Sequence, residues 1–200
     1  MRSYYRQPSS GYEVPASGVA LAVALILVSD ALMPESGEPI WLAGSLDEIA
    51  HLANGVVVLG AFGPGVDRRL ACGLIAASVL IDIDHVPQHR GAGWLTAGTA
   101  RPYPHSLLSL MGSLAAFLAL RRSAARAGAS STALGVLIGL SAHFLRDLAV
   151  PDTGMPLLWP IKNRAFSIRR RFYVASLAGA LAWSLAGRHA KRRRPLIGRN

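Results

Sequence analysis

The stretch Thr132–Val150, TALGVLIGLSAHFLRDLAV, is a run of 19 mostly apolar residues with ionisable groups only near its end. As an α-helix it would extend about 28 Å, close to the ~30 Å thickness of a hydrocarbon core. Its ionisable residues are His143, Arg146 and Asp147, and the first and last of these lie one helical turn apart on one face. Because such groups are costly at membrane depth, the stretch predicts a membrane helix that carries a functional site.

Five further apolar blocks share this composition, which is rich in Ala, Gly, Leu and Val, as is typical of closely packed membrane helices. They are Ala16–Met33, Ile49–Phe62, Leu70–Val86, His105–Leu120 and Phe172–Ala186. Hydrophobic residues make up 52% of the 200 residues and charged residues only 16%, whereas an average soluble domain has about 25% charged residues. We therefore predict an all-α fold, a polytopic membrane bundle of about six transmembrane helices.

Two alternatives to this prediction stay open. Blocks of this length also suit the core helices of a soluble all-α protein. The first block could instead be a signal peptide, although Asp30 and the missing cleavage pattern favour a retained helix.

The net charge of +10 is concentrated between the blocks and in the last residues of the chain. Basic residues follow the second and fourth blocks and fill the C-terminal tail, whereas the connection after the first block is acidic. The positive-inside rule therefore predicts a multi-pass protein of the inner (cytoplasmic) membrane with both termini in the cytoplasm. Segment 151–171 breaks the rule, because on the predicted outer side it carries Lys162, Arg164, Arg169, Arg170 and Arg171.

These patterns divide the chain into three parts. Residues 1–46 form an N-terminal extension with the first transmembrane helix, residues 47–187 a membrane domain, and residues 188–200 a basic cytoplasmic tail. The tail is expected to bind anionic membrane lipids, to which each basic residue near the surface contributes about 1 kcal/mol. Specific nucleic-acid binding is not expected, because no aromatic residues are interleaved with the basic ones.

Most of the ionisable residues at membrane depth fall in four short stretches. They are Asp47–His51, Asp82–His85, His105–Ser106 and His143–Asp147. Because helix directions alternate, all four stretches are expected at the same, outer end of the bundle. Converging imidazole nitrogens and carboxylate oxygens can bind a divalent ion, whether zinc, manganese or iron. The sequence therefore predicts a metal site at the outer membrane–water boundary, with enough ligands for two ions and a water held against a scissile centre.

The individual polar residues carry different expectations. Asp30 is expected to form only a hydrogen bond between helices. His89 is equally compatible with a position on the surface and with a role as a metal ligand. We assign catalytic roles to Asp82, which would ligate the metal or orient a ligand, and to two arginines. These are Arg101 and Arg146, the guanidinium groups best placed to contact a phosphoester.

Two other functions would use the same residue types. A transporter or a proton or ion relay also needs carboxylates and imidazoles within the membrane, although no inverted repeat supports a transporter. A non-catalytic scaffold would use the same groups only for hydrogen bonds between helices.

Three motifs in this order resemble those of the YdjM-like family. They are Asp82-Ile-Asp84-His85, then Arg101-Pro-Tyr-Pro-His105-Ser106, then His143-Phe-Leu-Arg-Asp147 with the following Gly154–Pro160. The resemblance covers roughly residues 47–160, with His51 in the family's first histidine region. Members are described as LexA-binding, inner-membrane-associated, metal-dependent hydrolases, near zinc-dependent phospholipase C and related nucleases.

The resemblance implies an all-helical enzyme that cleaves a phosphoester at a metal centre. Zinc is the first expectation for the cofactor, with manganese or iron as alternatives. The metal ligands that the resemblance implies are His51, Asp84, His85, His105, His143 and Asp147.

Overall fold

The computed structural model of the chain describes residues 11–34, 39–85, 104–150, 154–162 and 164–192, with the backbone alone at Asp84 and at 188–192. These residues form six α-helices, two short 3-10 helices and two isolated bridges, with no sheet among them. The elements are α1 (Ala16–Leu32), α2 (Ile40–Ala61), α3 (Arg68–Val79), η1 (Leu80–Asp84), α5 (Leu107–Leu120), η3 (Ala124–Arg126), α6 (Ala127–Asp147) and α7 (Arg170–Arg192). The prediction of an all-α fold is confirmed over this described part.

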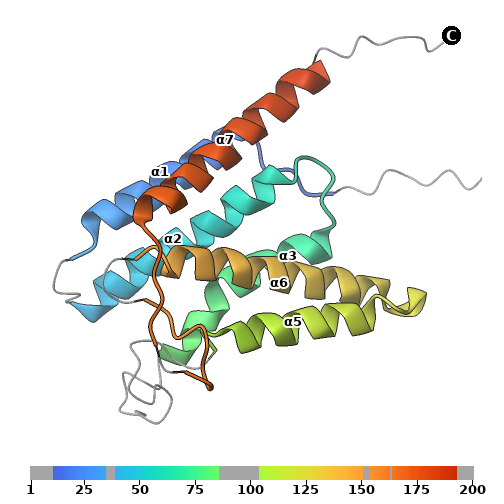
Figure 1. Cartoon of the computed structure of the whole chain (residues 1–200). Helices are drawn as coiled ribbons and strands as arrows, with labels where there is room; N and C mark the ends of the chain where they lie inside the picture. Colours follow the sequence, from blue (N-terminus) through green and yellow to red (C-terminus); the bar gives the residue numbers. More distant parts are fainter. Residues whose placement is uncertain (1–10, 35–38, 86–103, 151–153, 163, 193–200) are drawn as a thin grey trace, which may run out of the picture.

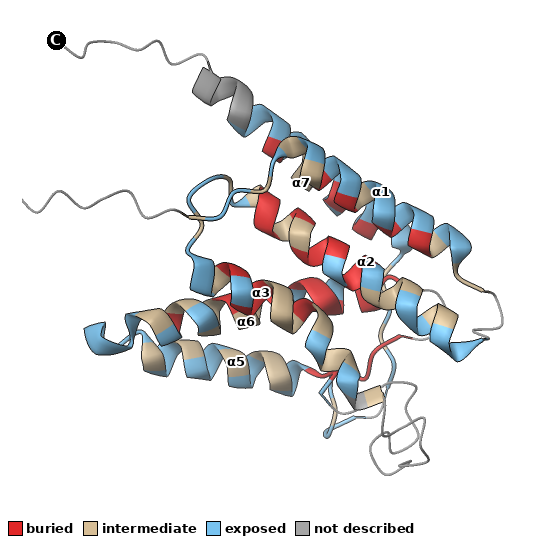
Figure 2. Ribbon diagram, turned by 180° about the vertical axis from the view of Figure 1, so that it is seen from behind, coloured by how far each residue is buried: buried red, intermediate tan, exposed pale blue. Residues whose placement is uncertain are grey.

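Each of the six α-helices has one end at the same side of the bundle, on the left in Figure 1. There α1, α3 and α6 end, whereas α2, α5 and α7 begin. Helices α1, α2 and α7 contact one another, α6 packs against both α3 and α5, and α2 joins the two groups through α3 and α6. Figure 2 shows that buried positions gather on α2 and the helices beside it, whereas α5 has none. Side chains on α2, α3 and α6 are therefore held between neighbouring helices.

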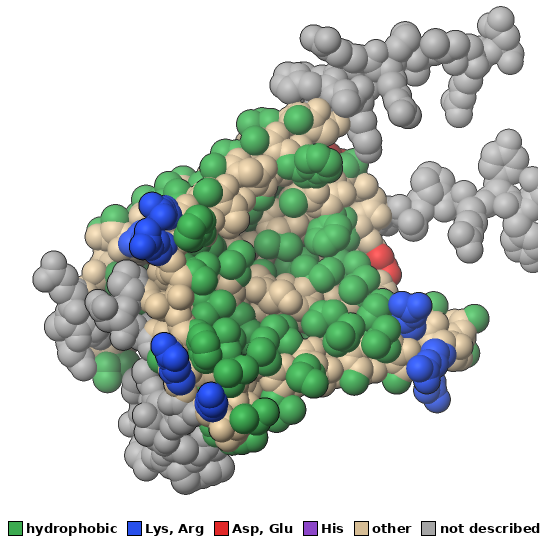
Figure 3. Space-filling view, in the orientation of Figure 1, with side chains coloured by type: hydrophobic (Ala, Val, Ile, Leu, Met, Phe, Trp, Pro, Cys, Tyr) green, Lys and Arg blue, Asp and Glu red, His purple; other side chains and the backbone are tan. Residues whose placement is uncertain are grey.

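The surface of the bundle supports a membrane protein. Two segments, Ile40–Ala61 and Ala124–Asp147, are long and apolar enough to cross a membrane, and α1 and α5 are shorter apolar helices. Figure 3 shows hydrophobic side chains over the middle of one face, with Lys and Arg side chains toward its ends. Met111 and Leu108 on α5 are 65% and 54% exposed, as lipid-facing residues are. Six membrane spans stay a prediction, because α3, with its 12 residues, extends only about 18 Å.

The packing of α3 against α6 requires two glycines. A Cβ atom at Gly135 would overlap the carbonyl oxygen of Leu70, and one at Gly139 would overlap that of Leu74. The two glycines are four residues apart on one face of α6, which lets the backbones approach closely. This approach places the chain that leaves the end of α3 beside the end of α6, where His143 and Asp147 lie.

At the opposite end of α3, Asp67 caps the helix and ties it to α6. One carboxylate oxygen accepts the backbone N–H of Arg69 at 3.0 Å, and the other accepts the Ser131 hydroxyl. The hydrogen bond from Ser131, and then that from Arg69, holds the pKa of Asp67 below its usual value. The capping interaction satisfies one of the N–H groups that a helix start leaves without a partner.

Two predicted boundaries were wrong. Helix α2 begins directly after Pro39 rather than at Ile49, because Asp47 and Glu48 interrupt the apolar run without ending the helix. His51 therefore lies near the middle of α2 and not at its start. The third block is not one continuous helix, because the α-helical backbone ends at Val79 and continues as the tighter η1.

Candidate metal centre

Four histidines and two aspartates lie together at the end of the bundle described above. They are His51 on α2, Asp82 on η1, His85 directly after η1, His105 before α5, and His143 and Asp147 on α6. The side chains of His51, His105, His143 and Asp147 are fully buried, whereas Asp82 is 8% and His85 23% exposed. Burial of ionisable groups is costly unless they are paired or bind a metal. The cluster is therefore a candidate functional site.

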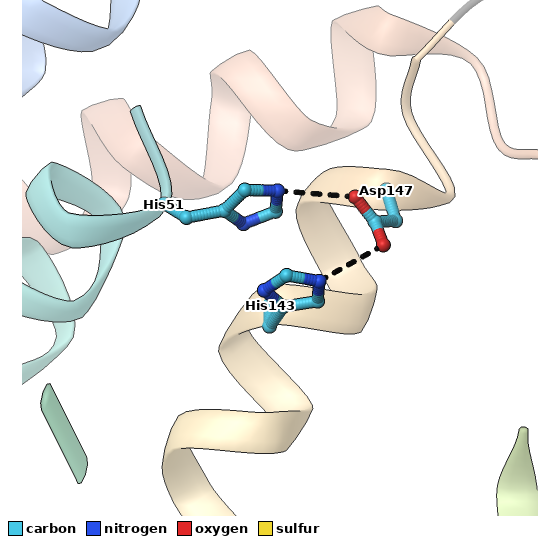
Figure 4. Close-up of side chains that lie close together, drawn as sticks. All are labelled: His51, His143 and Asp147. Atoms are coloured by element: carbon cyan, nitrogen blue, oxygen red, sulfur yellow. Dashed lines mark ion pairs between the residues drawn. The ribbon is translucent and has the colours of Figure 1, made fainter. Parts of the chain in front are cut away.

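Asp147 joins two of the histidines, as Figure 4 shows. Its Oδ1 lies 3.2 Å from His51 Nε2, and its Oδ2 lies 3.1 Å from His143 Nε2. The two imidazole rings are stacked, with centroids 3.7 Å apart and planes inclined by 13°. Stacking turns both Nε2 atoms toward the same carboxylate.

Asp82 is the second carboxylate of the cluster. Its Oδ1 lies 3.0 Å from His105 Nε2, 3.4 Å from His85 Nε2 and 3.5 Å from His143 Nε2. Its Oδ2 lies 3.7 Å from His51 Nε2. The Nε2 atoms of His105 and His143 are themselves 3.2 Å apart. The Nε2 atoms of all four histidines thus gather around two carboxylates.

These separations fit the ligands of a metal ion. Ligand atoms that sit about 2.0–2.1 Å from a tetrahedral ion lie about 3.3–3.4 Å from one another, and the contacts of the cluster scatter around this value. The protonation of His143 also fits, because its Nδ1 donates to the Ser78 carbonyl oxygen at 3.0 Å. Since a carbonyl only accepts, the neutral ring keeps its lone pair on Nε2, which is the tautomer a metal needs.

The ring of His51 gives a further indication. Both of its nitrogens are buried and neither forms a hydrogen bond, although Nε2 is near Asp147 and Asp82. Native proteins rarely bury a polar atom in this way without an ion, a water or a functional reason. The donor set, its spacing and this ring therefore fit a divalent metal.

Arg146, for which we predicted a catalytic role, forms its ion pairs outside the cluster. It is 2% exposed, and its Nη1 and Nη2 donate to Asp30 at 2.9 Å and Asp47 at 3.1 Å. Successive residues of a helix are about 100° apart, so Arg146 and Asp147 point to different neighbours. Asp30 also accepts a hydrogen bond from Arg170 at 2.9 Å. The prediction that Asp30 forms hydrogen bonds between helices is confirmed.

Some predicted residues lie outside the described part of the chain, and two acids without a predicted role lie near His51. Arg101, His89 and the side chain of Asp84 lie outside the described residues. Asp47 Oδ1 lies 3.6 Å from His51 Nε2, and Glu48 Oε2 is buried without a hydrogen bond. Their spacing of four and three residues from His51 on one helix is the signal that could have assigned them.

Residues 46–198 match the profile of the YdjM inner membrane protein family. The chain belongs to this family. No curated protein and no solved structure gives a significant match. The matched region contains the whole His/Asp cluster and extends through α7 into the basic tail, whereas α1 precedes it. Membership of the YdjM inner membrane protein family confirms the resemblance of the motifs and supports an inner membrane location.

Proposed function

We propose that this YdjM family member is a membrane-bound, metal-dependent hydrolase that cleaves a phosphoester. The observation that carries the proposal is the convergence of four Nε2 atoms on Asp82 and Asp147, with the His143 tautomer set by the Ser78 carbonyl. When bound, a divalent ion would activate water and polarise a phosphoryl oxygen. Zinc suits this mixture of imidazole and carboxylate ligands best, and manganese or iron also fit.

The charges around the cluster support a cation there. Asp82 and Asp147 are almost or fully buried, and their contacts shown above are with imidazole rings. The nearest buried guanidinium, that of Arg146, is engaged by Asp30 and Asp47. Two buried carboxylates need positive charge nearby, because an uncompensated buried anion is unfavourable by several kcal/mol. A divalent ion would provide that charge while keeping the histidines neutral.

The ligands are numerous enough to hold two ions. His51, His143 and Asp147 can converge on one position, and Asp82, His85 and His105 on another. A third possible group, Asp47, His51 and Asp82, takes one member from each set. The sets are also joined by the 3.2 Å contact between His105 and His143 and by three Nε2–Oδ contacts of 3.5–3.7 Å. Paired ions stabilise the attacking and the leaving oxygen of a displacement at phosphorus. This chemistry agrees with the phosphoesterase activity that the motifs suggested.

The membrane position suggests the substrate. Asp82, His105 and Asp147 lie near the ends of helices at the side of the bundle predicted to face outward, where a phosphoester headgroup of a lipid would meet the site. Arg164 and Arg169 are exposed on the segment between α6 and α7, where guanidinium groups can attract phosphate oxygens. We therefore propose a lipid-derived phosphoester as the first substrate class to test.

The test is the metal content of detergent-purified protein, measured by mass spectrometry beside the variant His143→Ala/Asp147→Asn. The matched control is His189→Ala, because residue 189 lies on the last turns of α7, at the other end of the bundle. We expect one or two equivalents of a transition metal in the wild type and the control, and its loss in the double variant. Phosphoester hydrolysis should be lost with it. A wild-type protein that binds neither zinc nor manganese after reconstitution would refute the proposal.

One observation favours a proton relay as the second candidate. The contacts from Asp47 through His51, Asp147 and His143 to Asp82 form a continuous series of titratable groups, 3.1–3.6 Å apart. Such a series could move protons between the helices of the bundle. It predicts a gradient-dependent proton flux in vesicles that survives a chelator, whereas the hydrolase predicts activity that a chelator abolishes.

A further inference from the structure

An ion-pair network centred on the buried Arg146 lies next to the cluster and connects helices that are far apart in the sequence. Arg146 on α6 donates from Nη1 to Asp30 on α1 and from Nη2 to Asp47 on α2, at 2.9 and 3.1 Å. Arg170, at the start of α7, donates to the other oxygen of Asp30 at 2.9 Å. Two aspartates and two arginines thus balance in charge and join four helices.

The network reaches the candidate metal ligands through Asp47. The same Oδ1 atom of Asp47 accepts from Arg146 and lies 3.6 Å from His51 Nε2. The position of this carboxylate therefore depends on how Arg146 divides its two donors between Asp30 and Asp47. If Asp30 no longer accepted from Nη1, both terminal nitrogens of Arg146 could pair with Asp47, because a bidentate pair is the more favourable geometry.

Helix α1 is outside the part of the chain that matches the family, which begins at residue 46. Even so, its buried side chains Val19, Ala22 and Ile26 pack with α2 and α7 in one core. Asp30 lies one turn beyond Ile26 and is 12% exposed at its side chain. The helix that precedes the family region is thus placed to act on the site.

We propose that Asp30 is a positioning residue for the site: it holds Arg146, and through Arg146 it fixes Asp47 beside His51. In this arrangement α1 is part of the functional unit and not only a membrane anchor. The effect on metal binding rests on the proposed function, whereas the effect on His51 does not. Replacing a residue that hydrogen-bonds a metal ligand typically lowers metal affinity about 10–100-fold.

The test uses the full-length protein in detergent and the variant Asp30→Asn, which removes the charge and keeps the shape. The ring nitrogen resonances of His51 are measured in metal-free protein labelled with 15N-histidine, and are assigned with His51→Gln. Zinc affinity is then measured by competition with a chelator. Glu13→Gln is the matched control, because it makes the same acid-to-amide change at an exposed position before α1. Asp30→Glu, which keeps the charge and moves the carboxylate by one methylene, is the second variant.

We expect Asp30→Asn to shift the His51 resonances and to weaken zinc binding by up to about 10-fold, the lower end of the range for residues that contact a ligand directly. Asp30→Glu should give a smaller shift in the same direction, and Glu13→Gln should leave both readouts unchanged. If Asp30→Asn does not fold, the His51 resonances of Asp30→Glu decide whether Asp30 positions the site. Unchanged His51 resonances in the folded variants would overturn the inference, even if thermal stability falls. If the wild type takes up no metal, the proposed function fails, and the His51 resonances alone still decide the role of Asp30.

Discussion

The substitution His143→Gln separates metal binding from packing at the centre of the cluster. Glutamine keeps much of the volume and retains a donor for the Ser78 carbonyl oxygen, which His143 Nδ1 now contacts at 3.0 Å. It lacks the Nε2 lone pair that faces Asp147 at 3.1 Å and Asp82 at 3.5 Å. We therefore expect the metal-free variant to stay folded while its zinc affinity falls by a factor of at least about 100.

The expected size follows from linkage between binding and stability. At a free zinc concentration 100 times the wild-type Kd, zinc stabilises the wild type by about 2.7 kcal/mol. For a variant with a 100-fold weaker site, the same concentration equals its Kd, and the stabilisation is only about 0.4 kcal/mol. The difference of about 2.3 kcal/mol belongs to the metal alone, because each protein is compared with its own metal-free form. For a chain of this length, 1 kcal/mol corresponds to about 2–4 °C in Tm.

The assay is thermal unfolding in detergent, with and without zinc. The wild type should gain about 5–11 °C from zinc and His143→Gln about 1–2 °C. Val57→Ala is the control, because Val57 is a buried apolar residue of α2 that contributes no ligand. This control should lower Tm in both forms by the same amount. A zinc-induced gain in His143→Gln equal to that of the wild type would refute a ligand role for His143.

Three further predictions test other parts of the structure. Replacing Gly139 with Leu should destabilise the protein by at least about 1–3 kcal/mol, measured by thermal unfolding, because a side chain there forces α3 away from α6; Gly44→Leu, at a position with open space, is the control. Asp67→Ala should cost about 0.5–2 kcal/mol through the lost helix cap. Because the pKa of Asp67 is lowered in the folded state, its contribution should be present above pH ~4 and fade as the pH falls through the folded pKa, with no such fading in Asp67→Ala. Finally, a chelator should abolish phosphoester hydrolysis and zinc should restore it, whereas hydrolysis that persists without metal would contradict the proposed function.

The sequence predicted those parts of the structure that depend on local spacing. The i, i+4 spacing of His143 and Asp147 on an apolar helix implies a shared face, and the structure places the two side chains 3.1 Å apart. The i, i+3 spacing of Asp82 and His85 is likewise accompanied by a 3.4 Å contact. Because helix directions alternate along the chain, we could also predict that the stretches with Asp82, His85, His143 and Asp147 lie on the same side of the bundle. These inferences need only the helical period and the chain direction.

The sequence could not predict the partners of Arg146. Its carboxylate partners, Asp30 and Asp47, lie on α1 and α2, and their choice depends on how these helices pack against α6. Because Arg146 is next to Asp147 in the sequence, we predicted that it contacts a phosphate group. Neighbouring residues on a helix, however, face different sides.

The start of α2 was predicted wrongly for a related reason. Hydropathy reports the apolar run, whereas the helix continues through Asp47 because its partner Arg146 compensates the charge.

The exposure of the two ligand sets suggests how a buried site could still carry out hydrolysis. His51, His143 and Asp147 have no solvent-accessible side-chain surface, so they form a closed set. The side chains of Asp82 and His85 are 8% and 23% exposed. Asp82 lies on η1, which directly follows α3, and His85 lies directly after η1. A catalytic ion needs an open coordination position for water or substrate. Under the proposed function, the set that contains Asp82 and His85 is therefore better placed than the closed set to admit water. The closed set then fixes α2 against α6 and keeps the two carboxylates at the spacing that the open set requires.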